Sequence, residues 1–282
     1  RIFSWCHPQT SSKFCRLCKS LESALKTKHF AKMNLTHFGV RNESYSENNK
    51  ICCRPRCEMD MMFFWWPRHF QQALVDLRWL NLEELNWSHD SYDFDNNSTV
   101  FLWAEIPSAI NLISNLRVLS LDNCALFGEI PRELYELVKL TKLTLSENQL
   151  TGSIDGSAIG GLKSLEVLDL SCNTLTGTIP HEIKYLVQLT HLMLHNNKIE
   201  GPLVHEIGSL VNLRHVYLHN NLLSGGIPSE LQALVRIEEF HADNNHLSGL
   251  IPSLWGWENC QICDFRNNDG LTRTSWIPGL RW

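Results

Sequence analysis

A short sequence unit recurs along most of the chain and constrains the fold more than any other feature. The unit is L-x-x-L-x-L-x-x-N-x-L, and its copies follow one another after 24 or 25 residues, starting at Leu116, Leu140, Leu165, Leu189, Leu213 and Ile237. A unit of this length cannot bury its apolar face alone, so stability requires the copies to stack on one another. We therefore predict an elongated solenoid in place of a single globular core.

Most units continue with a second motif, L-x-G-x-I-P, as in Leu175–Pro180 and Leu223–Pro228. Over about residues 82–278 the sequence resembles the leucine-rich-repeat family, and the second motif resembles its plant-type extracellular subclass. The resemblance implies an α/β solenoid, built as a right-handed superhelix with a curved parallel β-sheet on its concave face. It also implies short extended or 3-10 segments on the convex side and a helical N-terminal cap.

Local variations of the unit predict local structure. Proline excludes a regular helix at its own position, so a helical turn is expected after it, as through Arg132–Leu137. The copy at Ile154 lacks the proline and has one extra residue, which predicts a bulge. The recurring asparagines are expected to bond backbone groups of neighbouring turns. They are Asn148, Asn173, Asn197, Asn221 and Asn245, with Cys124 at this position in the first copy.

The chain divides into two parts of opposite charge. Residues 1–80 lack the repeat and are predicted to be a basic, cysteine-containing extension and cap with two helices, over Ser20–Met33 and Pro67–Leu77. Residues 81–282 are predicted to be the solenoid, with regular repeats over 116–259 and irregular terminal repeats on both sides. The first part has 13 Lys/Arg and 6 Asp/Glu (+7), and the second has 12 and 24 (−12). Aromatic residues are expected to pack as caps at the two ends: Phe63, Phe64, Trp65, Trp66, Trp255, Trp257, Trp276 and Trp282.

Cysteines and sequons indicate the compartment. Six of the ten cysteines lie in the first part: Cys6, Cys15, Cys18, Cys52, Cys53 and Cys57. Disulfides among them, a four-thiolate zinc site and free thiols all remain open. Five N-glycosylation sequons lie in segments expected to be loops or cap, at Asn34, Asn42, Asn86, Asn96 and Asn97. These features favour an extracellular or lumenal, secreted protein, with an intracellular or organellar assembly as the alternative.

Several functional classes are disfavoured. The net charge of −5 gives no case for binding nucleic acid. The longest apolar run, Met61–Trp66, is far shorter than the roughly 20 residues of a membrane-spanning helix. No G-x-S-x-G elbow, P-loop, H-E-x-x-H or dinucleotide fingerprint occurs, so no catalytic residue and no cofactor is assigned, and an enzyme is not expected.

Outward-facing side chains of the later repeats are rich in histidine. Adjacent strands of a sheet lie about 4.8 Å apart, so equivalent positions of successive repeats become lateral neighbours. The predicted partner-binding patch on the concave face comprises His191, Met193, His195, His215, Tyr217, His219, Glu239, His241 and Asp243.

Three interpretations of this patch remain open. The first is a hydrated polar face, and the third is a metal site. The second is a partner-binding surface that responds to pH, because clustered imidazoles titrate near neutrality. No metal is assigned, because no repeat motif sets ligand geometry and histidines on a flat sheet usually lack a closed coordination shell.

The sequence therefore predicts a non-enzymatic module that recognises a protein, a peptide or a glycan through its concave surface. Receptor ectodomains and polygalacturonase-inhibitor-like proteins are what the resemblance implies. The alternative is a structural or scaffold subunit of a larger multi-protein assembly, docked through residues 1–80. Packing of that segment on the first repeats alone would favour the free recognition module.

Overall fold

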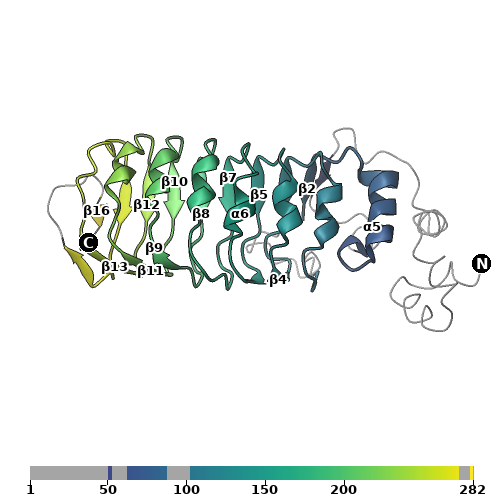
Figure 1. Ribbon diagram of the computed structural model, residues 1–282, viewed down its shortest axis with the longest axis horizontal. Helices are drawn as coiled ribbons and strands as arrows, with labels where there is room; N and C mark the ends of the chain where they lie inside the picture. Colours follow the sequence, from purple (N-terminus) through teal and green to yellow (C-terminus); the bar gives the residue numbers. More distant parts are fainter. Residues whose placement is uncertain (1–49, 53–61, 88–101, 273–279, 282) are drawn as a thin grey trace, which may run out of the picture.

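The computed structural model describes residues 50–52, 62–87, 102–272 and 280–281, which form one elongated stack of coils (Figure 1). Within this part of the chain, ten short strands make one parallel sheet, in the order β1-β2-β3-β5-β7-β8-β10-β12-β14-β16. The predicted solenoid with a long parallel sheet is confirmed. The strands are β1 (Lys50–Cys52), β2 (Glu84–Asn86), β3 (Val118–Ser120), β5 (Lys142–Thr144), β7 (Val167–Asp169), β8 (His191–Met193), β10 (His215–Tyr217), β12 (Glu239–His241), β14 (Ile262–Asp264) and β16 (Leu280–Arg281).

The pairing register of the sheet repeats the period of the sequence. Leu192 of β8 pairs with Val216 of β10, which pairs with Phe240 of β12, each one unit further along the chain. These three central side chains are fully buried, whereas the residues on either side of them are half-buried. Side chains of a strand alternate between its two faces, so each of these three strands places one apolar residue in the core and two variable residues on the concave face.

The return path of each coil carries short helical turns on the convex side, as the proline positions predict. The 3-10 turn η6 (Arg132–Glu136) follows Pro131 at the expected place, and the others recur at equivalent positions: η5 (Ser108–Leu112), η7 (His181–Tyr185), η8 (His205–Ser209) and η9 (Ser229–Ala233). Small parallel sheets link the coils before these turns, formed by β4 (Phe127–Glu129) with β6 (Gln149–Thr151), and by β9 (Glu200–Pro202), β11 (Leu222–Gly225), β13 (His246–Leu250) and β15 (Gly270–Thr272).

The copy at Ile154 lacks the proline and forms a different turn, whereas the copy with Val204 in place of the proline keeps the 3-10 turn η8. The extra residue of the copy at Ile154 is accommodated in α6 (Gly156–Ile159), a single turn of α-helix in place of 3-10. The Asp155 side chain caps this turn by accepting a hydrogen bond from the Ser157 backbone N–H at 2.8 Å. The local bulge expected here takes the form of a capped helical turn, because an aspartate N-cap satisfies an N–H group that a helix start leaves open.

Buried asparagines connect every coil to its neighbours, as predicted. Asn221 is 6% exposed, and its Oδ1 accepts a hydrogen bond from the Ile199 N–H at 3.0 Å. Its Nδ2 donates to the Leu194 and Leu218 carbonyls at 2.9 and 3.1 Å. One side chain thus satisfies backbone groups in its own coil and in the preceding one. Equivalent bonds are made by Asn148, Asn173, Asn197, Asn245 and Asn268.

We predict that Asn221→Ala lowers the free energy of unfolding by about 3 kcal/mol, because it leaves buried backbone donors and acceptors without partners. The matched control is the half-buried Asn212, whose Nδ2 donates to the Val187 carbonyl and whose Oδ1 accepts a hydrogen bond from Arg236. Asn212→Ala should change the free energy of unfolding by no more than about 0.5 kcal/mol. Urea unfolding followed by circular dichroism measures both, and equal effects would contradict the role given to the buried asparagines.

The N-terminal end of the described solenoid is covered by an aromatic cap. The cap begins with the 3-10 turn η3 (Met62–Phe64). The predicted second helix follows and is confirmed as α5 (Arg68–Leu74), which continues directly into the π-helical turn η4 (Val75–Trp79). The Phe63 ring lies 4.9 Å from the Trp79 ring, and both side chains are fully buried in the same core as the repeats. Trp65 differs from the expectation, since it is 43% exposed and its indole N–H donates to the Leu102 carbonyl.

The C-terminal end corrects one expectation about capping. Trp257 is fully buried against Phe240, with a ring separation of 4.9 Å, and its indole N–H donates to the Leu231 carbonyl. Trp255 is 81% exposed and does not pack in the cap. Trp276 and Trp282 lie outside the described residues.

The four cysteines of the repeats are free thiols: Cys124, Cys172, Cys260 and Cys263. Of the residues proposed for disulfides, the backbone of Cys52 lies in β1, while Cys6, Cys15, Cys18, Cys53 and Cys57 are outside the described part. Among the sequons, Asn86 ends β2 and is half-buried between Cys52 and Ser120, so it belongs to a strand and not to a loop. The helix predicted over Ser20–Met33 and the sequons at Asn34, Asn42, Asn96 and Asn97 lie outside the described residues.

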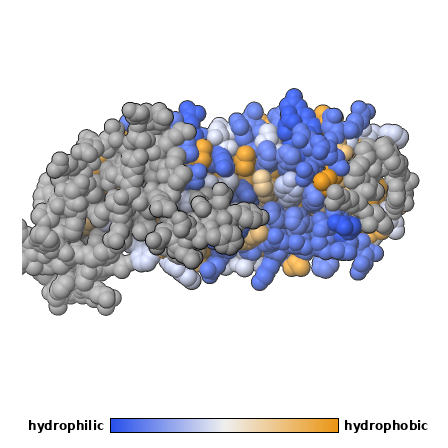
Figure 2. All heavy atoms as spheres, turned by 180° about the vertical axis from the view of Figure 1, so that it is seen from behind, coloured by the Kyte–Doolittle hydropathy of each residue, from blue (hydrophilic) through white to orange (hydrophobic). Residues whose placement is uncertain are grey.

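The described surface seen in Figure 2 is mostly hydrophilic, with hydrophobic residues in small separate groups. No helix among the described residues has both the length and the apolar character needed to cross a bilayer.

Candidate functional site

The concave face of β8, β10 and β12 brings together all nine residues of the predicted partner-binding patch. Across neighbouring strands, His191 of β8 pairs with His215 of β10, which pairs with Glu239 of β12. Met193 pairs in the same way with Tyr217, and Tyr217 pairs with His241. His195, His219 and Asp243 follow at the equivalent position two residues beyond each strand. We call this group the histidine patch.

Two pairs of histidines stack across neighbouring coils. The rings of His191 and His215 are 4.7 Å apart with an interplanar angle of 28°. The rings of His195 and His219 are 4.5 Å apart with an angle of 19°. Stacking at these distances follows from the strand spacing, which places identical side chains of successive repeats in contact.

A tyrosine and a glutamate form the centre of the patch. The Tyr217 hydroxyl donates a hydrogen bond to the Glu239 carboxylate at 2.7 Å, and the His241 Nε2 lies 3.5 Å from the same carboxylate. This bond from Tyr217 is the main reason that the pKa of Glu239 lies below its usual range. Burial and the same bond raise the pKa of Tyr217. Glu239 therefore stays ionised, and Tyr217 is held neutral with its ring beside the His241 ring, 5.1 Å away.

Burial favours the uncharged form of three histidines of the patch. It lowers the pKa of His195 to about 4, with a further contribution from His219. Burial also lowers the pKa of His191 and of His219. The Nδ1 atoms of His195 and His219 are buried and have no hydrogen-bond partner within the described part of the chain. Neutral imidazoles with free ring nitrogens can accept a hydrogen bond or ligate a metal, which protonated imidazoles cannot do.

We predict that His195 in metal-free protein stays neutral until the pH approaches 4, well below its ordinary value of 6.5. Unfolded chains take up this proton near pH 6.5, so between pH 6.5 and 4 the unfolded state binds more protons and stability falls as the pH falls. An NMR titration of the imidazole Cε1–H resonance, assigned by its absence in His195→Gln, measures the midpoint. A midpoint near 6.5 would contradict the burial of this ring.

Two neighbouring residues belong to the site but were not predicted from the sequence. Asp264 of β14 pairs with His241 in the sheet, and the Arg266 guanidinium donates to its carboxylate through two nitrogens, at 2.6 to 3.1 Å. Burial alone would raise the pKa of Asp264, but the bonds from Arg266 outweigh it and hold the pKa below its usual value. Extending the repeat frame by one 23-residue step, from Ile237 to Cys260, would have placed Asp264 in the same column as His241.

Comparison with protein families identifies the repeats themselves. A model described as leucine-rich repeat matches residues 138–199, and a second leucine-rich-repeat model matches residues 115–137 and 212–234. No curated protein sequence matches the chain.

Solved structures similar to this chain include plant receptor ectodomains. The Arabidopsis receptor kinase HAESA, in complex with the peptide hormone IDA and the co-receptor SERK1, is 30% identical with a TM-score of 0.60, over 72% of this chain and 31% of that one. A TDR receptor is 31% identical with a TM-score of 0.58, over 74% and 32%. The ectodomain of GASSHO1/SCHENGEN3 from Arabidopsis thaliana, in complex with CASPARIAN STRIP INTEGRITY FACTOR 2, is 26% identical with a TM-score of 0.55, over 75% and 26%. The chain thus spans about one third of the length of these ectodomains, or less.

Proposed function

Because the chain belongs to the leucine-rich-repeat family, we propose that it is a recognition module that binds a protein or peptide partner across the histidine patch. The observation that carries this proposal is the change in chemistry along the concave face. The variable positions of β3, β5 and β7 hold small, aliphatic or singly charged residues: Val118, Ser120, Lys142, Thr144, Val167 and Asp169. Those of β8, β10 and β12 hold three histidines, one tyrosine, one methionine and one glutamate.

The residue types of the patch suit a protein partner. Tyrosine and methionine are enriched in the cores of protein interfaces, where they supply contact area with few polar atoms to desolvate. The Tyr217 hydroxyl already donates to Glu239, so the side chain presents mainly its ring to a partner. Neutral histidines can likewise be covered without the cost of burying a charge.

The patch is also preorganised. Its rings are held by stacking on their lateral neighbours, and their backbones by the sheet, so binding orders few side chains. A parallel sheet offers a broad surface and not a deep cavity, which favours an extended peptide or a protein face over a small molecule. A glycan is the other ligand class that aromatic and carboxylate side chains could contact.

The N-terminal segment supports a free recognition module over a docked scaffold. In its described part, residues 50–52 and 62–80, β1 pairs with β2 of the solenoid, and Phe63, Phe64 and Trp79 are buried in the same core as the repeats by this chain alone. Similarity to ectodomains of plant membrane receptors supports an extracellular or lumenal location for the protein.

The test is a selection of random linear peptides on the intact chain, followed by affinity measurements with variants. We expect the triple variant His195→Ala, Tyr217→Ala, His219→Ala to weaken a selected peptide by about 30-fold or more, the effect of losing one interface hot spot. The matched control is His181→Ala with His205→Ala, two exposed histidines on the convex turns η7 and η8. Selected peptides that bind the triple variant as tightly as the intact chain would exclude the patch.

A further inference from the structure

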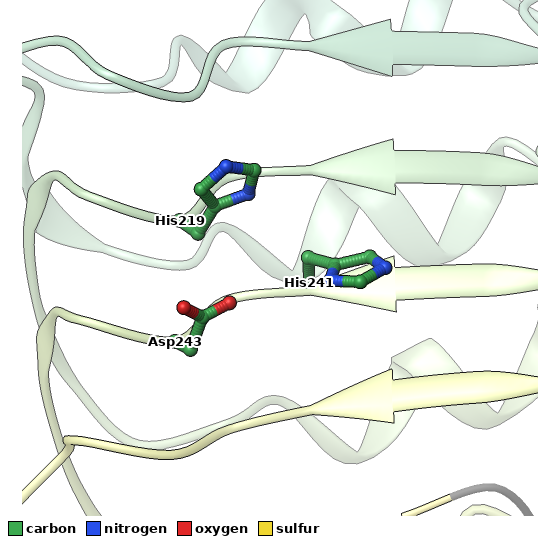
Figure 3. Close-up of side chains that lie close together, drawn as sticks. All are labelled: His219, His241 and Asp243. Carbon is green, nitrogen blue, oxygen red and sulfur yellow. The ribbon is translucent and has the colours of Figure 1, made fainter. Parts of the chain in front are cut away.

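We propose that His219, His241 and Asp243 form a binding site for a divalent transition-metal ion, with zinc as the ion that best suits these ligands. One ligand atom from each residue lies within 4.8 Å of the other two. Figure 3 shows the three side chains on two adjacent coils, with His219 beyond β10 and with His241 and Asp243 at the end of β12. This inference is independent of whether the concave face binds a partner.

The backbone holds the two coils of the site in fixed register. The Leu218 N–H donates to the His241 carbonyl at 2.7 Å, and the Asn220 N–H donates to the Asp243 carbonyl at 3.0 Å. Only side-chain torsions are then needed to close the site. Tetrahedral zinc, with ligands at about 2.0–2.2 Å, requires ligand atoms about 3.4 Å apart, so they must approach one another by little more than 1 Å.

A ring nitrogen of the site has no hydrogen-bond partner among the described residues and is therefore free to bind a metal ion. Among the described residues, His219 Nδ1 is buried without a hydrogen-bond partner, as is Nδ1 of the stacked His195, whereas His241 Nε2 lies 3.5 Å from the Glu239 carboxylate. A buried polar atom without a partner is costly, and coordination would satisfy it. Asn244 Nδ2 donates to Asp243 Oδ2 at 2.5 Å, which orients the carboxylate as outer-shell partners of metal ligands do.

The donor set selects the kind of ion. Two imidazoles and one carboxylate are ligands of zinc and related transition metals, whereas calcium and magnesium take oxygen ligands almost alone. The neighbouring Arg266 guanidinium donates its hydrogen bonds to Asp264 through two nitrogens and acts on Asp243 through its charge. Three protein ligands leave a fourth position for water.

The other histidines of the chain provide controls. His191 and His215 stack on the same face. Neither belongs to the described group of three ligands that lie within 4.8 Å of one another. His181 lies on the convex side, where its Nδ1 is already 2.8 Å from the Glu206 carboxylate. The spacing of the ligand atoms therefore distinguishes the proposed site from the other described histidines.

The experiment is equilibrium dialysis of the full, chelator-treated chain against zinc chloride, with bound zinc counted per chain. Intact protein should bind one zinc ion more than His219→Ala with His241→Ala, and zinc held by cysteines would be equal in both. Asp243→Asn should weaken this zinc by at least about tenfold, the lower limit seen on removing even an outer-shell partner. His191→Ala with His215→Ala should retain it.

A second measurement keeps the proposal testable if a variant folds poorly. Cobalt(II) added to the intact chain should give the visible absorption of a tetrahedral nitrogen and oxygen site, and one equivalent of zinc should abolish it. The proposal is overturned if the intact chain and the His219→Ala, His241→Ala variant bind equal amounts of zinc. It is also overturned if removing His191 and His215 lowers zinc binding as much as removing His219 and His241.

Discussion

The buried asparagine of each coil is the interaction on which the rest of the structure depends. A solenoid coil must turn away from its strand inside the molecule, where backbone groups would otherwise lose their hydrogen bonds to water. The amide of Asn221 supplies those bonds in two coils at once. The residue before it, Asn220, adopts a left-handed backbone with φ of 55°, and Asn123, Asn196, Asn244 and Asn267 do the same. Asparagine tolerates this conformation better than most residues, but Glu147 and Cys172 adopt it at the equivalent positions of two other coils, so the coil imposes the turn on whichever residue stands there.

A constant turn fixes the register of the sheet, and the register creates the histidine patch. Every residue lies beside the residue one unit earlier and one unit later, so a motif that recurs in sequence becomes a cluster in space. His195 and His219 stack for this reason, and His219 and Asp243 become neighbours although 24 residues separate them. Because the core residues between them are conserved in type within the chain, chemistry on the concave face can change without altering the fold.

The periodic features of the structure were predictable from the sequence, and the aperiodic ones were not. The strands, the asparagine bonds and the lateral neighbours of His191 and His215 all follow from the repeat frame. The α-helical turn at Asp155, the exposure of Trp255 and the strand position of Asn86 depend on single residues and their local partners. At the site, the frame predicted which residues meet. It did not predict the bond from Tyr217 to Glu239 or the approach of His219, His241 and Asp243, because these depend on side-chain torsions.

The central claim is that recognition resides in the later repeats while every repeat serves the fold equally. Two deletions of 24 residues test it: residues 117–140, which joins Leu116 to Thr141, and residues 190–213, which joins Leu189 to Arg214. Both preserve the repeat frame, so both chains should fold with similar stability. A peptide selected on the intact chain should bind the first deletion with unchanged affinity and the second at least about tenfold more weakly, a loss of about 1.4 kcal/mol. Equal affinities of the two deletions would contradict the account.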